Sequence, residues 1–381
     1  MDTPTVGHNP GASRRGLDAA ALGERLRGIG FTPFFIDATG STNTDLVEAV
    51  RAEGEKGSRE ATGAESLNFY NQTGEVPHLS VLLAEEQLAG RGRMGRPWTA
   101  PRYSQVIASV VLRLNGIPAD SLGLLPLLTG MAIAQGVRTA SESAGRELSA
   151  ELKWPNDVLI CGRKLAGILV EAAKVDMGVA NGGQMGPLLK EAVVVLGFGV
   201  NYDLAVDELP VAHATSIALE AEQLAKNKAP DQPMDQPASN QRASDGRISG
   251  EGISGEGTPR RTAGLGAAIP DREAVIFHIL ENLQRDVARF KQLGGAPEAI
   301  MGRYRQLSAT IGTRVKAFLP GDEFVTGMAV DVDTSGELVI QVETHEGKRA
   351  IAPGQRLTVA AGDVEHLRSA DISRHSEWGY A

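Results

Sequence analysis

Residues 79–114, LSVLLAEEQLAGRGRMGRPWTAPRYSQVIASVVLRL, contain two strand-like runs with a glycine-rich loop between them. The runs Leu79–Ala84 and Gln105–Leu114 are rich in Val, Leu and Ile, which is typical of buried strands. Whether the glycine-rich loop opens a helix decides between a dinucleotide-binding fold and other folds built on a sheet.

The loop has the spacing of a dinucleotide fingerprint but not its context. Its G-x-G-x-x-G pattern is formed by Gly90, Gly92 and Gly95. In a dinucleotide-binding unit this pattern opens a helix, and an acidic residue follows about 20 positions later. Here Pro97 and Trp98 follow at once, and residues 110–118 contain no Asp or Glu. The sequence therefore argues against a nicotinamide site.

The same loop is rich in arginine, with Arg91, Arg93 and Arg96 set among the glycines. A guanidinium group binds a carboxylate or phosphate through two parallel hydrogen bonds, and glycine lets the backbone approach a ligand closely. The loop therefore predicts an oxyanion-binding site. A solvated basic turn is the alternative.

The remaining apolar patterns indicate a mixed sheet with packed helices. Further strands are predicted at Asp157–Ile160, Ile168–Ala173 and Ala192–Val200. Helices are predicted at Gly123–Thr139 and Asp271–Phe290, and another is predicted to begin near Asn43. This combination predicts an α+β fold for a domain that covers residues 31–305.

Several stretches differ from this domain in composition. Residues 221–268 are rich in Pro, Gly, Ser and Gln and predict a disordered insertion, and residues 52–78 predict a milder one. Residues 313–367 consist of short strand-like pieces between turns, which predicts a second domain, a small antiparallel barrel. We expect residues 1–30 and 368–381 to be flexible ends.

The bulk composition limits the classes of function. The 381-residue chain has a formal net charge of −9, which argues against broad, nonspecific binding to nucleic acid or anionic membranes. Its one cysteine excludes an intramolecular disulfide and a thiolate-bound structural zinc, and predicts a reducing compartment, the cytoplasm. The chain shows neither the apolar run of a secretory signal nor the stretch of about 18 apolar residues expected of a membrane span.

Charged and amide side chains gather just before a predicted strand. Residues 153–157, KWPND, bring together Lys153, Asn156 and Asp157 around an aromatic residue and a proline. Lys164 follows in GRKLAGILVE, at a spacing that fits a hairpin returning the lysine to the Asp157 carboxylate. A solvent-facing hairpin lysine is the alternative.

Two other polar positions are weaker signals by themselves. The run Ser41-Thr42-Asn43 is consistent with a simple N-cap for the helix that follows. Asn201 ends the apolar strand in GFGVN, and we expect it to be exposed at the strand tip, where ligands of open sheets bind.

Taken in order, these motifs resemble those of the biotin protein ligases. The resemblance rests on GSTNTDL (40–46), AEEQLAGRGRMGRPW (84–98), KWPNDVLICGRKLAGILVE (153–171), LGFGVN (196–201), HATSIALE (213–220) and GDVEHLR (362–368). It implies a catalytic domain related to class II aminoacyl-tRNA synthetases and lipoate ligases, followed by an SH3-like barrel. It also implies an enzyme that joins biotin to AMP with release of pyrophosphate and then passes biotin to a lysine of a biotin carboxyl carrier domain.

The resemblance assigns roles to individual residues. The implied biotin-binding residues are Ser41, Thr42, Asn43, Gln87, Gly90, Arg91, Gly92, Arg93, Lys164 and Gly167. The implied ATP-binding residues are Arg91, Arg93, Trp98, Lys153, Asn156 and Asn201, and the implied catalytic residues are Arg93, Asp157 and Lys164. Mg²⁺ is expected to be held mostly by phosphate oxygens, with Asp157 as the candidate protein ligand.

Two other functions stay open. A lipoate or other acyl-acid ligase of the same superfamily is the first, but lipoate has no ureido group to occupy the polar residues at 41–43 and 87. A catalytically silent biotin or nucleotide sensor is the second. The segment before Ser41 is too short for a winged-helix DNA-binding domain, so we expect no repressor role. The expected partner is the carrier domain of an acyl-CoA carboxylase, with the ligase a monomer or weak homodimer.

Overall fold

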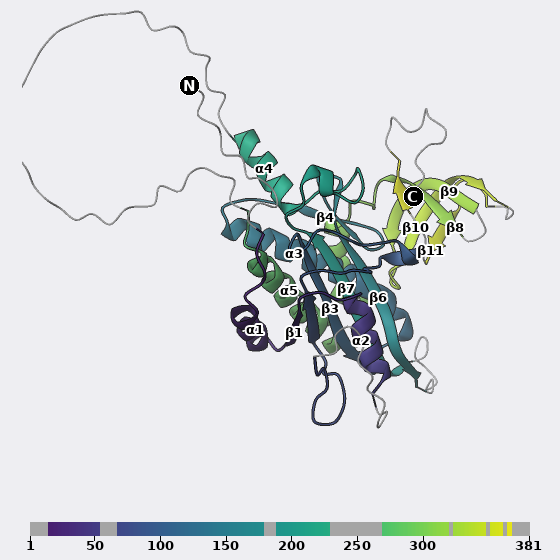
Figure 1. Cartoon of the computed structure of the whole chain (residues 1–381). Helices are drawn as coiled ribbons and strands as arrows, with labels where there is room; N and C mark the ends of the chain where they lie inside the picture. Colours follow the sequence, from purple (N-terminus) through teal and green to yellow (C-terminus); the bar gives the residue numbers. More distant parts are fainter. Residues whose placement is uncertain are drawn as a thin grey trace, which may run out of the picture.

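The computed structural model describes residues 14–53, 67–178, 188–228, 269–319, 323–347, 351–360 and 364–367. Within these ranges the chain forms a seven-stranded sheet with packed helices and a second, five-stranded sheet near the C-terminus (Figure 1). The larger sheet is mixed, because β1 and β2 pair in parallel while its other neighbours pair antiparallel. The predicted α+β class is confirmed at this level.

The larger sheet has the strand order β1-β2-β3-β7-β6-β5-β4. Its strands are β1 Thr32–Ile36, β2 Ser80–Ala84, β3 Gln105–Leu114, β4 Ala150–Lys153, β5 Asp157–Ile160, β6 Arg163–Met177 and β7 Leu189–Asn201. The five predicted strands are present, with β6 and β7 longer than expected. The two missed strands lie at the edges of the sheet, and Pro33 within β1 is tolerated there because an edge strand does not need every N–H.

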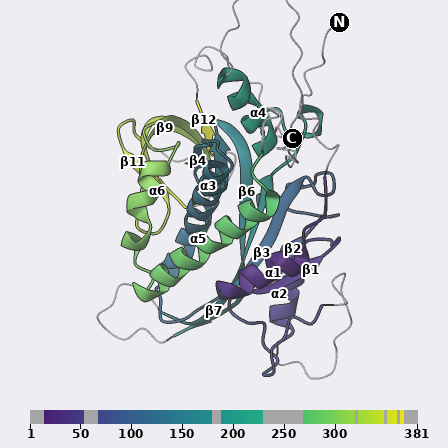
Figure 2. The ribbon, with the colours of Figure 1, turned by 90° about the vertical axis from the view of Figure 1, so that its left-hand side faces the viewer.

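The helices cover both faces of this sheet. They are α1 Ala19–Gly28, α2 Thr42–Arg51, α3 Leu125–Ser143, α4 Ile217–Lys228, α5 Arg272–Gln292 and α6 Met301–Leu307, with short 3₁₀ turns η1 Arg93–Gly95, η2 Ala119–Leu124, η3 Val206–Glu208 and η4 Pro297–Ala299. Helices α1, α3 and α5 pack on one face and α2 on the other. Figure 2 shows α3 and α5 side by side.

The apolar run of β7 is continuous because both of its faces are buried. Val194 and Leu196 belong to the main core with α3 and α5, whereas Val193 and Val195 belong to a second core with α2. Successive side chains of a strand point to opposite faces, so a strand covered on both sides needs apolar residues at every position.

Helix α3 is apolar for the same reason. Together with η2, it is long and apolar enough by composition to cross a membrane. It lies between the sheet and α5, however, and most of this stretch is buried inside the protein. Core packing therefore accounts for its composition.

Three of the predicted segment limits need correction. Residues 14–30 are not a flexible end, because α1 buries Leu22 and Leu26 against the main core. Residues 221–228 of the predicted insertion continue α4 rather than being disordered, and Phe69 and Val76 of the second insertion are buried against α2. Residues 1–13, 54–66, 229–268 and 368–381 lie outside the described residues.

The indole of Trp154 is one of the contacts that join the second sheet to the first domain. Its strands are β8 Arg314–Leu319, β9 Glu323–Val332, β10 Leu338–Glu346, β11 Arg356–Val359 and β12 Val364–His366, in the order β11-β10-β9-β8-β12. The indole Nε1 of Trp154 donates to the Gly336 carbonyl at 2.9 Å, and the Trp154 backbone N–H donates to Thr310 Oγ1 at 3.0 Å. The SH3-like and class II synthetase-like assignments, and the domain limits, stay predictions.

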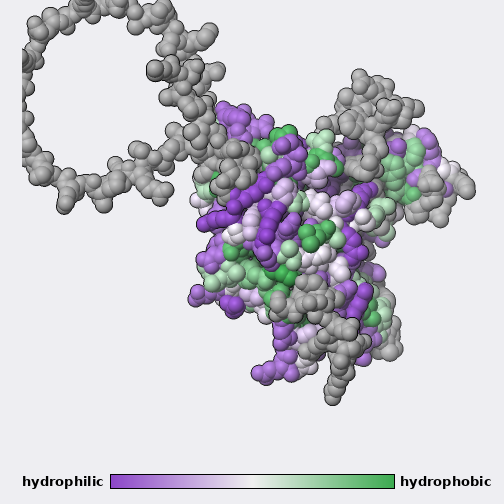
Figure 3. Space-filling model, viewed as in Figure 1, coloured by the Kyte–Doolittle hydropathy of each residue, from purple (hydrophilic) through white to green (hydrophobic). Residues whose placement is uncertain are grey.

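Few large hydrophobic side chains are exposed in the part of the chain that the structure describes. The large hydrophobic side chains that are exposed in the described ranges are Leu88, Met94, Val175, Met177, Val206 and Leu293. On the face seen in Figure 3, hydrophobic residues form small groups among hydrophilic ones. Two of the exposed residues, Leu88 and Met94, lie in and beside the glycine loop.

A partly buried histidine makes the stability of the fold depend on pH. His78 Nδ1 accepts the backbone N–H of Arg113 at 3.1 Å. Burial, and then the positive charges of Lys291 and Arg113, lower the pKa of His78 from 6.5 to about 4. Between these pH values the unfolded chain binds the proton and the folded protein does not, so this stabilising contribution is lost as the pH falls from 6.5 to about 4.

We expect His78→Asn to reduce this loss, because Asn Oδ1 accepts the same hydrogen bond without taking up a proton. Urea unfolding across this pH window measures the effect as a flatter dependence of the free energy of unfolding on pH. Identical pH dependence in the variant and the parent protein would contradict the assignment.

Candidate active site

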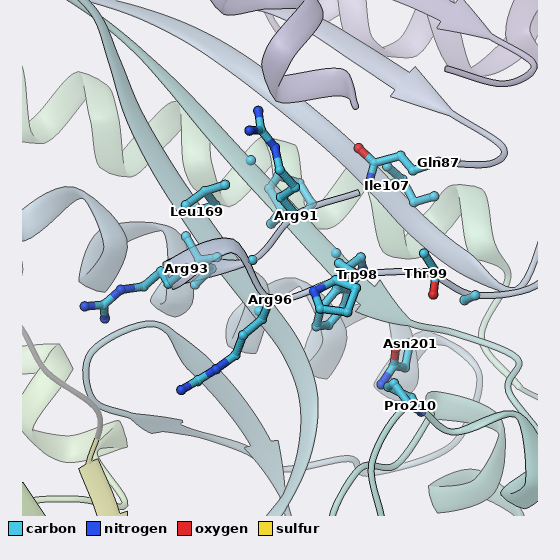
Figure 4. A pocket seen from close by; sticks show the side chains of 18 of the residues that line it. Gln87, Arg91, Arg93, Arg96, Trp98, Thr99, Ile107, Leu169, Asn201 and Pro210 are labelled. Atoms are coloured by element: carbon cyan, nitrogen blue, oxygen red, sulfur yellow. The ribbon is translucent and has the colours of Figure 1, made fainter. Parts of the chain in front are cut away.

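A cavity of about 770 Å³ opens above three strands of the larger sheet. Its floor consists of β3, β7 and β6, and its walls come from the start of α2, the glycine loop, the KWPND turn and the residues after β7 (Figure 4). A volume of this size is ordinary for a small-molecule site.

The floor consists of rows of residues across the three strands. Strand β7 runs through the middle and presents Gly197, Gly199 and Asn201 to the cavity, since alternate residues of a strand share a face. The row at Gly197 continues to Ser109 and Leu169, the row at Gly199 to Ile107 and Gly167, and Asn201 pairs with Gln105. The cavity therefore has a Gly197 end, a middle at Gly199 and an Asn201 end.

Two of these floor positions require glycine for steric reasons. A Cβ at Gly197 would lie 2.1 Å from Asn43 Oδ1, and a Cβ at Gly199 would lie 2.3 Å from Trp98 Nε1. Asn43 and Trp98 thus lie directly on the backbone of β7. The Trp98 Nε1 is buried and has no hydrogen-bond partner among the described residues.

A cluster of polar side chains lines the Gly197 end. Gln87 Oε1 accepts from the Thr42 backbone N–H at 2.9 Å and from Thr42 Oγ1 at 3.1 Å. Thr42 Oγ1 also lies 2.7 Å from Ser109 Oγ. Ser41 caps α2 by accepting the Thr44 N–H at 3.4 Å, so the predicted N-cap is confirmed, and Ser41 lines the cavity as well.

The orientation of the Asn43 amide is fixed from three directions. Asn43 Oδ1 accepts from Ser109 Oγ at 2.7 Å, and Nδ2 donates to Glu171 Oε2 at 2.8 Å and to the Leu169 carbonyl at 3.2 Å. Neither Ser109 nor Glu171 was predicted. The available signal for Ser109 is its hydroxyl within the apolar run 105–114, on the same face as Gln105.

The glycine loop is a small closed turn and opens no long helix. The Gly92 N–H donates to the Arg96 carbonyl at 2.7 Å, and the Trp98 N–H donates to the Gly90 carbonyl at 2.8 Å. Gly90 does not line the cavity, unlike the other predicted biotin-binding residues. A Cβ there would lie 2.2 Å from the Trp98 carbonyl oxygen, so Gly90 serves the closure of the loop.

The arginines of this loop line one cavity, but their guanidinium groups do not converge. Arg91 donates to Thr44 Oγ1 at 2.7 Å, and Arg93 donates to Asn156 Oδ1 at 3.3 Å on another wall. Figure 4 shows Arg91, Arg93 and Arg96 pointing in different directions. Because the guanidinium groups are not directed at one point, their roles in binding an oxyanion stay predictions.

The predicted hairpin contact between β5 and β6 is confirmed. Lys164 Nζ lies 2.8 Å from Asp157 Oδ1, and 5.6 Å from the centre of the Trp98 ring. The Lys164 backbone also bonds to the segment after β7, since its N–H donates to the His213 carbonyl at 2.8 Å. The ammonium group therefore lies near the middle of the cavity.

Asn201 lines the cavity but is buried rather than exposed at a strand tip. It is 0% exposed, its Oδ1 accepts from Gln105 Nε2 at 2.9 Å, and its Nδ2 donates to the Thr215 carbonyl at 3.0 Å. The sequence prediction of an exposed amide was wrong, because the segment after β7 folds back over the end of the strand. Its contact with a nucleotide stays a prediction.

The structure brings the other predicted site residues to this one cavity. They are Ser41, Thr42, Asn43, Gln87, Arg91, Gly92, Arg93, Trp98, Lys153, Asn156, Asp157, Lys164, Gly167 and Asn201. Residues that the sequence did not indicate also line it, namely Ser109, Glu208, His213 and Val364. Val364 comes from β12 of the second sheet, a placement that no local sequence pattern reports.

Comparisons with known proteins agree with this arrangement. Residues 64–186 match the model of the biotin/lipoate A/B protein ligase family, and residues 310–367 match that of the biotin protein ligase C terminal domain. The chain is 32% identical over 355 residues to the biotin--[acetyl-CoA-carboxylase] ligase of Mycobacterium tuberculosis (strain ATCC 25618 / H37Rv), covering 92% of this chain and 96% of that protein.

Two further comparisons extend this result. The bifunctional ligase/repressor BirA of Bacillus subtilis (strain 168) is 28% identical over 276 residues, which is 72% of this chain and 65% of that protein. The solved biotin protein ligase from Aquifex aeolicus in complex with biotin and ATP has a TM-score of 0.52 at 17% identity, covering 88% of this chain and 99% of that one. With a relative at 32% identity along nearly its whole length, the chain belongs to the biotin protein ligase family.

Proposed function

We propose that this enzyme joins biotin to AMP at the expense of ATP and then transfers biotin to one lysine of a biotin carboxyl carrier domain. The observation that carries the proposal is a single cavity with a polar cluster at one end, Lys164 near its middle and the arginine loop along its wall. The polar cluster of Ser41, Thr42, Asn43 and Gln87 suits the ureido group of biotin, which offers two donors and one acceptor.

In the proposed first step, a carboxylate oxygen of biotin attacks the α-phosphorus of ATP. A P–O bond forms, the bond from the α-phosphorus to the bridging oxygen breaks, and pyrophosphate leaves. Two like unit charges about 4 Å apart repel by about 4 kcal/mol at the effective dielectric of a protein surface. Fixed cations offset this repulsion, and we assign that role to Lys164, Arg91 and Arg93.

In the proposed second step, the amine of the acceptor lysine attacks the acyl carbon of biotinyl-AMP and AMP leaves. A free lysine has a pKa of about 10.4, so only about one in a thousand is neutral at pH 7. We propose that Asp157 orients this amine and accepts its proton. The 2.8 Å contact with Lys164 keeps this carboxylate at the middle of the cavity.

We propose Mg²⁺ as the metal that accompanies ATP, where it would offset phosphate charge. The described residues contain no group of three or more His, Cys, Asp or Glu side chains that could hold a metal. Asp157 lines the cavity with one oxygen engaged by Lys164, which suits an ion held mostly by phosphate oxygens. We place Trp98 near the adenine, where a ligand could supply a partner for its unpaired Nε1.

Pyrophosphate release measured with each acid separately tests the proposal. We expect pyrophosphate release that needs both ATP and biotin, because lipoate has no ureido group to form hydrogen bonds with the polar end of the cavity. Comparable release with lipoate would favour an acyl-acid ligase of other specificity. If neither biotin nor lipoate supports the release of pyrophosphate, a sensor that binds without catalysis is favoured.

The biological setting belongs to the same proposal. We propose the carrier domain of an acyl-CoA carboxylase as the acceptor, a cytoplasmic location, and a monomer or weak homodimer without a repressor role. Transfer of biotin to a purified carrier domain checks the acceptor. A DNA-binding assay at physiological salt, in which we expect no binding, checks the absence of a repressor role.

A further inference from the structure

The segment before α1 contacts two of the chain segments that form the walls of the cavity. We call residues 14–17 the N-terminal strap. Its first side chain, that of Arg14, is only 10% exposed although it lies outside any helix or strand. The neighbouring Arg15 side chain is 78% exposed. The strap therefore directs one of two adjacent arginines into the protein.

Arg14 holds the loop that follows β7. Its Nε donates to the Asp203 carbonyl at 3.1 Å, and its two terminal nitrogens donate to the two carboxylate oxygens of Glu208 at 3.0 and 2.5 Å. Glu208 Oε2 also accepts the Ala205 N–H at 2.8 Å. One guanidinium group thus joins the beginning and the end of the segment Asp203–Glu208.

The electrostatics of this contact favour the charged pair. The hydrogen bond from Arg14 holds the pKa of Glu208 below its usual range, and the hydrogen bond to Glu208 raises the pKa of Arg14. Both pKa shifts favour the charged forms of the two side chains. A bidentate pair of this kind also fixes the relative orientation of the two groups.

The loop held by Arg14 forms the Asn201 end of the cavity. Strand β7 passes Asn43 at Gly197 and Trp98 at Gly199, so its continuation beyond Asn201 lies farthest from the polar biotin cluster. The cavity residues from this loop are Glu208, Pro210, Val211, His213 and Ala214. Under the proposed function, this is the nucleotide end.

The other end of the strap is fixed to Glu85, at the beginning of the wall that follows β2. The Leu17 N–H donates to Glu85 Oε1 at 2.5 Å, and Arg272 donates to Glu85 Oε2 at 2.7 Å and to the Arg15 carbonyl at 2.9 Å. Glu85 directly precedes Glu86 and Gln87, which line the cavity. The strap therefore spans the wall after β2 and the wall after β7.

We infer that Arg14 is a positioning residue, which holds the loop 203–214 in the conformation that receives the nucleotide. Arg14 does not line the cavity, so it acts through Glu208 and the backbone of Asp203. The inference rests on the proposed function for the identity of the ligand. The coupling of Arg14 to the loop does not depend on that identity.

The test uses three variants of the full-length protein. We expect Arg14→Ala to raise KM for ATP about tenfold, which corresponds to about 1.4 kcal/mol, and to leave KM for biotin within about twofold. Arg14→Lys keeps the positive charge but cannot donate two parallel hydrogen bonds to one carboxylate. Its KM for ATP should therefore lie between those of the parent and Arg14→Ala. Arg15→Ala is the matched control, because it removes an exposed neighbour, and it should behave as the parent.

Hydrogen exchange gives a readout that needs no catalysis. Amides of residues 203–214 should exchange faster in Arg14→Ala than in Arg15→Ala, with exchange in the rest of the sheet unchanged. Equal exchange in the two variants, or a parallel rise of KM for ATP and biotin in Arg14→Ala and Arg14→Lys, overturns the inference. A parent protein that releases no pyrophosphate would instead overturn the proposed function, while the exchange result would still decide the role of Arg14.

Discussion

Lys164→Ala is expected to lower the rate of biotin adenylation by about 10²–10³-fold, the usual cost of losing one group that stabilises transition-state charge. The ammonium lies near the middle of the cavity, 5.6 Å from the centre of the Trp98 ring, and we place the reacting carboxylate and phosphate beside it. Initial rates of pyrophosphate release at saturating biotin and ATP measure the effect as a change in kcat.

The variant also leaves Asp157 without its 2.8 Å partner. An unpaired carboxylate then repels the same substrate oxyanions that the lysine attracted, so both effects act in one direction. Lys190→Ala is the matched control, because Lys190 of β7 forms a 3.0 Å pair with Asp176 of β6 in the same sheet but at an exposed site. Turnover of Lys164→Ala equal to that of the control would remove Lys164 from the mechanism.

The contact between Lys164 and Asp157 was predictable because it is local. The turn residues between β5 and β6 fix the hairpin, and the hairpin fixes which side chains meet. The cluster at Ser41–Asn43 and the glycine loop were found in a similar way, from short motifs. Their meeting in one cavity followed from the family resemblance, since spacing alone says nothing about residues this far apart.

The strap could not be predicted from the sequence. Arg14 reaches Asp203 and Glu208, which lie 189 and 194 positions away. The sequence around it is rich in Gly, Ser and Arg and has no period, which is the usual signature of a flexible end. Burial of one guanidinium group against a loop carboxylate and a loop carbonyl is decided by tertiary structure, and composition does not report it.

The predicted insertions show the same limit on a smaller scale. Composition marked residues 52–78 as one polar stretch, yet Phe69 and Val76 within it are buried against α2. The few apolar residues of this stretch are not spaced with the period of a helix or a strand. The burial of Phe69 and Val76 depends on their contact with the apolar face of α2, which includes Leu46 and Val50.

Gly197→Ala is expected to raise KM for biotin on the order of 100-fold. The new Cβ would lie 2.1 Å from Asn43 Oδ1, far closer than a non-bonded contact of a Cβ allows, so the amide must move. Asn43 cannot move freely, because Ser109 and Glu171 hold its two ends. Displacing it breaks one hydrogen bond of the buried Ser109 hydroxyl, about 0.5–1.5 kcal/mol, and one of the partly buried Glu171 carboxylate, about 1.5–3 kcal/mol. About 1.4 kcal/mol corresponds to a factor of ten.

The effect should be specific to the biotin end of the cavity. KM for ATP should change far less, because Asn201, at the nucleotide end, lies beyond the Trp98 contact of Gly199 along β7. Gly302→Ala in α6 is the control, since its Cβ meets nothing within 4 Å and alanine favours a helix over glycine. If Gly197→Ala and Gly302→Ala bind biotin equally well, the fixed Asn43 amide does not define the biotin site. The ureido group of biotin then binds elsewhere in the cavity.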